Sequence, residues 1–174
     1  MKYTAVAVLS LLAACDGGGG VPPAKVGTAT DQAPNEALLE GNKLLAQREA
    51  HDIDAWIARQ GLGMEGTGTG VRLKLVEDSA GTNAVPLQTA SITFNVSLID
   101  GTVCYASEPG EPEDFTIEKD NVESGLHEAI QRLSVGDSAI IVIPSHRAYG
   151  LAGDSKKIPM RSTVIYHLRL VGLR

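Results

Sequence analysis

The spacing of the apolar residues changes near Val71, and this change limits the folds open to the chain more than any other feature. Upstream of it, residues 35–60 carry apolar side chains at near-helical spacing, with polar and charged side chains on the other face. These apolar residues are Leu38, Leu45, Ile53, Trp56 and Ile57. We predict a helix over 35–60, which Gly61 and Gly63 end. Its apolar face must pack on the C-terminal domain or on a second copy of the chain, and the sequence favours neither.

From Val71 onward, apolar and polar residues alternate in the manner of half-buried strands. We predict alternating strands at 71–75, 92–98 and 163–170, and a fully apolar strand at 139–143 that ends before Pro144. Residues 122–133 place their apolar side chains on one face of a short helix. Several antiparallel strands with one short helix laid across them make an α+β domain.

The N-terminus has the pattern of an export signal. Lys2 precedes an apolar run over 4–14, which is shorter than the roughly 20 residues needed to span a bilayer. The run ends in Leu12-Ala13-Ala14-Cys15 and resembles a bacterial lipobox, in which the cysteine carries lipid and becomes the mature N-terminus. We expect a signal peptide over 1–14, a lipid on Cys15 and a glycine-rich flexible tether over 15–34. The other interpretation is an apolar helix that happens to end in cysteine.

Composition narrows the function. A chain of 174 residues, 43% hydrophobic and 21% charged, suffices for one globular domain with an extension. The net charge of −6 argues against nucleic acid as a partner, because nucleic-acid-binding proteins carry a basic face. The four histidines are scattered without metal-ligand spacing, so we predict no metal and no cofactor.

Four motifs lie between about Phe115 and the end of the chain: the segments 124–137, 143–150, 158–159 and 163–170. Their order and spacing can be matched to one known family without gaps. Together they resemble FKBP-type peptidyl-prolyl cis–trans isomerases, over about residues 69–174. The resemblance implies an FKBP-like twisted antiparallel sheet wrapped on one short helix, with residues 35–68 as a preceding helix and linker. That preceding helix is similar to an extension of lipoprotein isomerases of Bacteroidetes-like bacteria, some of them linked to gliding motility.

The resemblance also assigns site residues. It implies that the Tyr149 hydroxyl points at a substrate carbonyl, that the Glu123 backbone N–H binds a carbonyl, and that Leu126 forms the pocket floor where the family has tryptophan. The walls of the pocket would be Phe94, Phe115, Val122, Ile158 and Tyr166. By periodicity alone, the inward-facing strand positions of Phe94, Phe115 and Tyr166 favour core packing over a binding pocket, and only the resemblance reverses this preference.

One position departs from the family. Cys104-Tyr105 stands where the family has Phe-Asp, and we expect the Tyr105 hydroxyl to serve in place of the missing carboxylate. The acidic, proline-rich segment 108–114 is expected to form a solvated loop at the pocket edge that favours basic client segments.

The resemblance implies an isomerase that acts on the X-Pro bonds of exported, proline-containing polypeptides. Rotation about such a bond crosses a barrier of about 18–20 kcal/mol without making or breaking a covalent bond. We expect the protein to be lipid-anchored in the bacterial cell envelope, with its oligomeric state open. The alternative is a non-catalytic chaperone or binding lipoprotein with the same fold in an envelope assembly.

Overall fold

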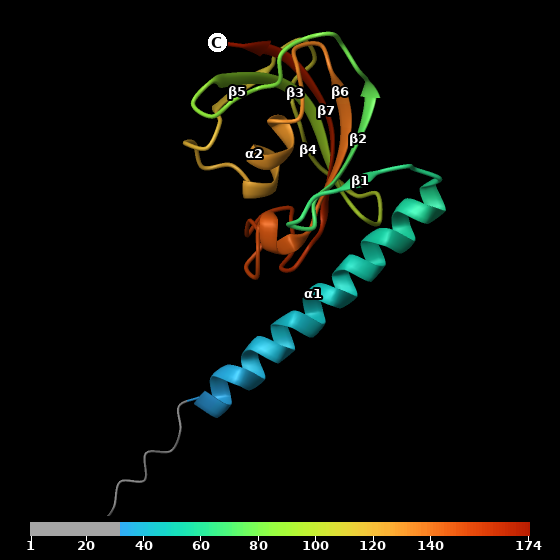
Figure 1. Ribbon diagram of the computed structural model, residues 1–174, viewed down its shortest axis with the longest axis vertical. Coiled ribbons are helices and arrows are strands. Elements are labelled where there is room, and N and C mark those ends of the chain that lie inside the picture. The colour runs from blue at the N-terminus through green and yellow to red at the C-terminus, as the bar shows by residue number, and fades with distance from the viewer. Residues whose placement is uncertain (1–31) are drawn as a thin grey trace, which may run out of the picture.

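The computed structural model describes residues 32–174 (Figure 1). The expected signal peptide, Cys15 and most of the expected tether lie outside these residues. The elements are α1 (Gln32–Gln60), β1 (Glu65–Gly66), β2 (Arg72–Glu77), β3 (Thr89–Leu98), β4 (Val103–Ala106), β5 (Glu113–Thr116), α2 (Ser124–Ile130), β6 (Ser138–Ile143), the 3-10 helix η1 (Ser145–Arg147) and β7 (Val164–Leu173). The four strands expected from sequence are present as β2, β3, β6 and β7, with ends that differ by up to three residues.

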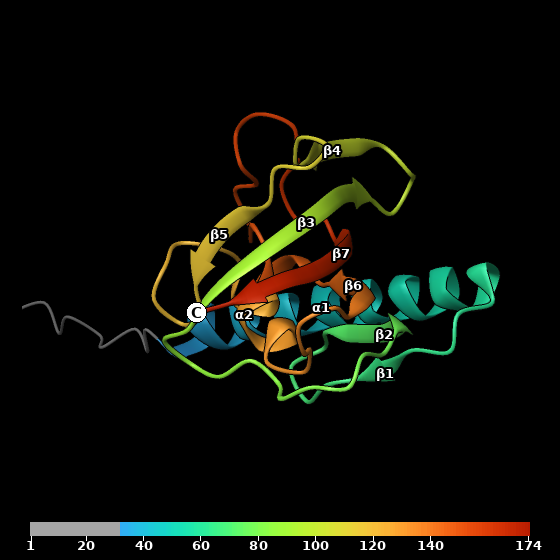
Figure 2. The same ribbon diagram turned by 90° about the horizontal axis from the view of Figure 1, so that it is seen from above.

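One seven-stranded antiparallel sheet forms the body of the domain. Its order is β1-β2-β6-β7-β3-β4, and β5 also pairs with β3. The two ten-residue strands β3 and β7 lie side by side at its centre (Figure 2). Their register places Val96 opposite Tyr166 and Phe94 opposite Leu168, so alternate side chains of both strands share one face. The predicted α+β class, several antiparallel strands with one short helix across them, is confirmed.

The short helix α2 packs against one face of this sheet. Its buried residues are Gly125, Leu126, Ala129 and Ile130. The prediction of a helix over 122–133 was too long at both ends. Glu123 has an extended backbone, with φ −60° and ψ 134°, so the helix begins only after it. Leu133 is buried as the apolar pattern required, but it lies in a turn beyond the helix.

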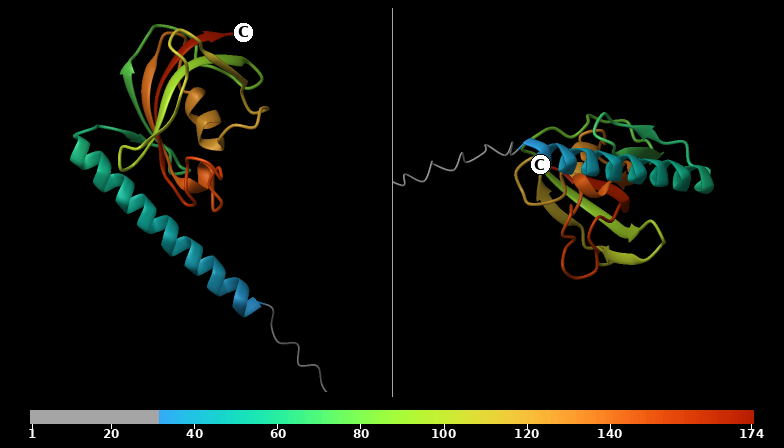
Figure 3. Two further views of the ribbon diagram at one scale, coloured as in Figure 1. Left: turned by 180° about the vertical axis from the view of Figure 1, so that it is seen from behind. Right: turned by 90° about the horizontal axis from the view of Figure 1, so that it is seen from below.

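The long helix α1 crosses the opposite face of the sheet (Figures 1 and 3). Ile53, which is 1% exposed, packs with Val142 and Ile165, and Trp56 and Ile57 pack beside them. Val142 and Ile165 alternate with the residues that face α2, which explains why the two helices cover opposite faces. The C-terminal part of α1 therefore packs on its own domain.

Glu49 fixes the middle of α1. Its Oε1 accepts hydrogen bonds from the Ser145 N–H at 2.6 Å and the Thr163 hydroxyl at 2.7 Å, and its Oε2 accepts one from the Ser145 hydroxyl at 2.8 Å. The first turns of α1 extend past the domain (Figure 3), and Leu38 and Leu39 are 65% and 67% exposed there. Within residues 32–174, no helix combines the length and apolar character that a bilayer crossing needs.

Candidate active site

A pocket of about 540 Å³ opens between α2, the face of the sheet that α2 covers, and the loop that follows β6. Eight of the nine site residues expected from sequence line it: Phe94, Tyr105, Phe115, Val122, Glu123, Leu126, Tyr149 and Tyr166. The ninth, Ile158, is not among the lining residues. Its side chain is 2% exposed and belongs to the main core, and its N–H donates to Asp154 Oδ1 at 2.8 Å.

The apolar part of the pocket comes from three elements. Phe94 on β3 and Tyr166 on β7 face the same side of the sheet, and their ring centroids are 5.9 Å apart with a tilt of 47°. Leu126, from the first turn of α2, is 3% exposed and lies between the helix and the sheet. Because the strand register and the helix both converge here, aromatic and aliphatic surface is concentrated at one place that a proline ring can occupy.

A carboxylate lies within this apolar surface. The Tyr166 hydroxyl donates to Glu123 Oε1 at 2.8 Å, and the two residues are only 4% and 8% exposed. The sequence indicated a role for the Glu123 backbone but not for its side chain. Nothing in the spacing of the sequence could have revealed the pair, because its members are 43 positions apart.

The Tyr149 hydroxyl lies close to the Glu123 carboxylate and the Tyr166 hydroxyl. It makes no hydrogen bond of ordinary distance and angle in the described part of the chain, so its proton can turn to a substrate. Burial, and then the neighbouring Glu123 carboxylate, raises the pKa of Tyr149. Burial and the same carboxylate also raise the pKa of Tyr166. Both hydroxyls therefore keep their protons at neutral pH and can donate hydrogen bonds.

A backbone donor is also available at the edge of α2. The N–H of Glu123 finds no acceptor among residues 32–174, since the extended backbone at this position places it before the helical hydrogen-bond ladder. The expected binding of a substrate carbonyl by this N–H stays a prediction that the geometry permits.

The Tyr105 hydroxyl is already engaged. It donates a hydrogen bond to Asp154 Oδ2, and this bond joins β4 to the loop after η1. Lys157 Nζ lies 4.9 Å from the centre of the Tyr105 ring. Burial opposes ionisation of Asp154, but hydrogen bonds from Tyr105 and from the amides of Ile158 and Lys156 outweigh it and lower the pKa of Asp154 to about 2. Sequence reasoning missed Asp154, which sits in a loop without periodicity.

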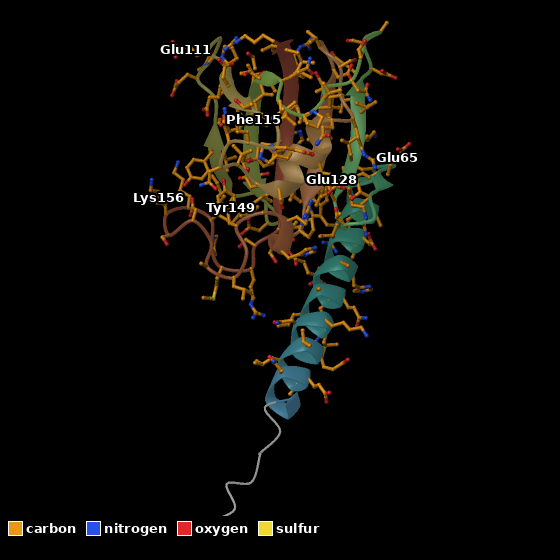
Figure 4. All side chains as sticks on the ribbon, turned by 60° about the vertical axis from the view of Figure 1, so that its left-hand side comes forward. Glu65, Glu111, Phe115, Glu128, Tyr149 and Lys156 are labelled. Carbon is orange, nitrogen blue, oxygen red and sulfur yellow. The ribbon has the colours of Figure 1, made fainter. Side chains whose placement is uncertain are left out.

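The rim of the pocket is acidic. Glu113, Asp114 and Asp154 line it together with the single base Lys156. Figure 4 shows Tyr149, Phe115 and Lys156 on the pocket side of the domain, away from Glu65 on β1. No group of three or more His, Cys, Asp or Glu side chains in the described residues is arranged to hold a metal ion.

Comparison with known proteins agrees with this geometry. The sequence profile of the FKBP-type peptidyl-prolyl cis-trans isomerases matches residues 81–171. FK506-binding protein 2 of Yarrowia lipolytica is 32% identical over 105 residues, which are 60% of this chain and 73% of that protein. The outer membrane protein MIP of Legionella longbeachae is 26% identical over 107 residues, which are 61% of this chain and 45% of that protein.

Among solved structures, FkpA from Escherichia coli is similar with a TM-score of 0.64 and 27% identity. The similarity covers 82% of this chain and 67% of FkpA. That share is larger than residues 69–174 alone, so it extends into α1. The matches confirm the resemblance and the enzyme class predicted from sequence, and they do not favour the non-catalytic alternative.

Proposed function

Because this chain belongs to the family of FKBP-type peptidyl-prolyl cis-trans isomerases, we propose that its pocket accelerates rotation about X-Pro bonds of exported proteins. The observation that carries this proposal is the Tyr149 hydroxyl, a protonated donor beside apolar surface that makes no well-formed hydrogen bond in the described residues. The family acts on proline-containing polypeptides; the restriction to exported clients is our inference from the N-terminal sequence.

The chemistry needs only binding. A planar X-Pro amide resists rotation because its C–N bond has partial double-bond character, which is lost when the amide twists. A pocket that binds the twisted amide more tightly than either planar form lowers the barrier. The apolar surface at Leu126, Phe94 and Tyr166 holds the proline ring and excludes water, and the Tyr149 hydroxyl and the Glu123 N–H fix the substrate carbonyls.

A substitution at Tyr149 tests the proposal. In a protease-coupled assay on a proline tetrapeptide, the wild-type protein should accelerate isomerisation. Tyr149→Phe should lower kcat/KM by about two- to tenfold, because one hydrogen bond is worth about 0.5–1.5 kcal/mol. The unfolding midpoint should change little, since the hydroxyl makes no well-formed hydrogen bond in the described residues. A folded wild-type protein that gives no acceleration above background would contradict the proposed activity.

We infer further that the protein acts at a membrane of the bacterial envelope, held by a lipid on Cys15. The lipobox-like string and the glycine-rich segment after it support this anchor, and the relative named outer membrane protein MIP supports the location. Several acyl chains on one residue bind a bilayer far more firmly than one chain does. Cys15→Ser should shift the protein from the membrane fraction to the soluble fraction, or block its processing. An unmodified mature protein that is soluble in the wild type would refute the anchor.

A further inference from the structure

The side chain of Glu123 has a role that the proposed isomerase pocket does not account for. A carboxylate has about four lone-pair sites for hydrogen bonds. Tyr166 fills one of them at Oε1, and Oε2 accepts no hydrogen bond of ordinary distance and angle in the described part of the chain, although the Tyr149 hydroxyl lies close to this carboxylate. Arg147 Nε is the sole fully buried side-chain polar atom there that lacks a partner, so Oε2 keeps its access to the open space of the pocket.

The charges around Glu123 do not neutralise it. Asp114 is paired with Arg174, and Asp154 is occupied by Tyr105 and by two backbone amides. Glu113 and Glu123 form no ion pair among residues 32–174, and the exposed Lys156 is the one base in the lining. The pocket therefore has an excess of negative charge both at its rim and beside its floor.

Binding of a client changes the surroundings of Oε2. A proline segment that fills the pocket displaces the water that solvates this oxygen. A charged group that loses water without gaining a donor is strongly disfavoured, whereas a charge-assisted hydrogen bond compensates for the loss. The pocket thus penalises an entirely apolar occupant and rewards one that brings a positive donor.

The position of the donor follows from Tyr149. Glu123 and Tyr149 line the same pocket, and the carboxylate is close enough to this hydroxyl to influence its ionisation. The carbonyl of the rotating amide belongs to the residue before proline. If the Tyr149 hydroxyl binds this carbonyl, the side chain of the same residue comes close to the Glu123 carboxylate.

Resting on the proposed isomerase function, we propose that Glu123 is a specificity-determining residue that favours lysine or arginine immediately before the proline of a client. The expectation drawn from the acidic segment 108–114 concerned the rim alone. The structure supplies a second and deeper carboxylate, on the edge of α2, that lines the pocket itself.

A matched pair of peptides tests this assignment. Succinyl-Ala-Xaa-Pro-Phe-4-nitroanilide with lysine or norleucine at Xaa differs in the ammonium group on an aliphatic stem of similar length. For the wild-type protein at low salt, kcat/KM should be about tenfold higher for lysine, which corresponds to about 1.4 kcal/mol. In Glu123→Gln the ratio should fall to about one while the norleucine peptide is still turned over, because the amide can accept from Tyr166 but has no charge.

Two further variants complete the test. Glu123→Asp keeps the charge and should keep a preference for lysine. This variant still tests the role of the charge if Glu123→Gln does not fold. Glu65→Gln makes the same chemical change on exposed β1, away from the pocket, and should leave the ratio at the wild-type value. Equal rates for the two peptides in the wild type, or an undiminished ratio in folded Glu123→Gln, would overturn the proposal.

Binding separates this proposal from the proposed function. Both peptides can be titrated into isotope-labelled protein and followed by amide chemical shifts. Turnover of both peptides at equal rates contradicts the role of Glu123 and leaves the isomerase intact. Binding with a Glu123-dependent preference for lysine but no acceleration contradicts the isomerase and supports the role of Glu123.

Discussion

At the scale of single residues, the pocket depends on where hydroxyl groups find acceptors. Tyr166 and Tyr105 both donate to carboxylates, whereas Tyr149 makes no well-formed hydrogen bond in the described residues. A hydroxyl whose hydrogen bond is satisfied inside the protein has little to offer a substrate, and a free one can donate without first breaking a bond. This difference, rather than proximity to the pocket, singles out Tyr149 as the substrate donor.

The same substitution at two tyrosines should have unequal effects on stability. Tyr166→Phe removes the hydrogen bond to a carboxylate that is 8% exposed, and it should lower the free energy of unfolding by about 1–3 kcal/mol. Tyr105→Phe should cost less, because Asp154 is better solvated and keeps the amides of Lys156 and Ile158. Urea unfolding measures both. A larger loss at Tyr105 would contradict this account of the two carboxylates.

At the scale of elements, the close approach of α2 to β6 sets the shape of the pocket floor. A Cβ atom built on Gly125 would lie 2.3 Å from Ile143 Cγ2 and 3.2 Å from Val71 Cγ2. Real Cβ atoms do not approach other atoms so closely, so only glycine lets the helix lie at this depth. Since Leu126 follows directly, the depth of α2 also decides where the floor of the pocket lies.

Two glycine substitutions in helices should therefore have opposite consequences. Alanine is favoured over glycine inside a helix by about 1 kcal/mol. Gly41→Ala in α1 meets no atom within 4 Å and should raise the helix content seen by circular dichroism. Gly125→Ala should lower the free energy of unfolding by about 1–3 kcal/mol in spite of the helix preference, because overpacking forces α2 or Ile143 to move. A Gly125→Ala protein as stable as the wild type would show that α2 does not pack tightly against β6.

At the scale of the whole molecule, acidic groups that accept hydrogen bonds within the fold tie stability to pH. Asp137 joins the turn after α2 to the segment after β2: its Oδ1 accepts from the Ser79 N–H at 2.6 Å and its Oδ2 from the Ser134 N–H at 2.7 Å. Burial would raise the pKa of Asp137, but these hydrogen bonds outweigh burial and lower it. Asp154, with a pKa of about 2, and Glu128, with a lowered pKa, act in the same direction.

The protein should consequently lose stability in acid. A carboxyl group whose pKa is lower in the folded state stabilises the fold above its unfolded value, which is about 4, and loses this contribution as pH falls through the folded value. The free energy of unfolding, measured with urea, should change little between about pH 7 and pH 5 and fall between about pH 4 and pH 2. Asp137→Asn should be less stable at neutral pH and show a shallower acid dependence. Asp78→Asn, at an exposed position without hydrogen bonds in the described residues, serves as the control.

The sequence by itself determined the fold class and most of the pocket. Alternation along β3 and β7 required Phe94 and Tyr166 to share a face, and the motif around Tyr149 placed this residue in the loop after β6. These features are local, because a strand or helix period records burial within a few residues. The expected domain boundaries and the lipid on Cys15 stay predictions.

Only the tertiary structure decided which polar groups meet. Tyr105 and Asp154 are 49 positions apart, and Glu123 and Tyr166 are 43 apart. No periodicity connects residues so far apart. The sequence shows that the family carboxylate is missing at position 105, but it does not show that the carboxylate of Glu123 lies in the pocket. The packing of Ile53 in α1 on its own domain, and the orientation of Ile158 into the core, also depend on contacts that form only when distant segments come together.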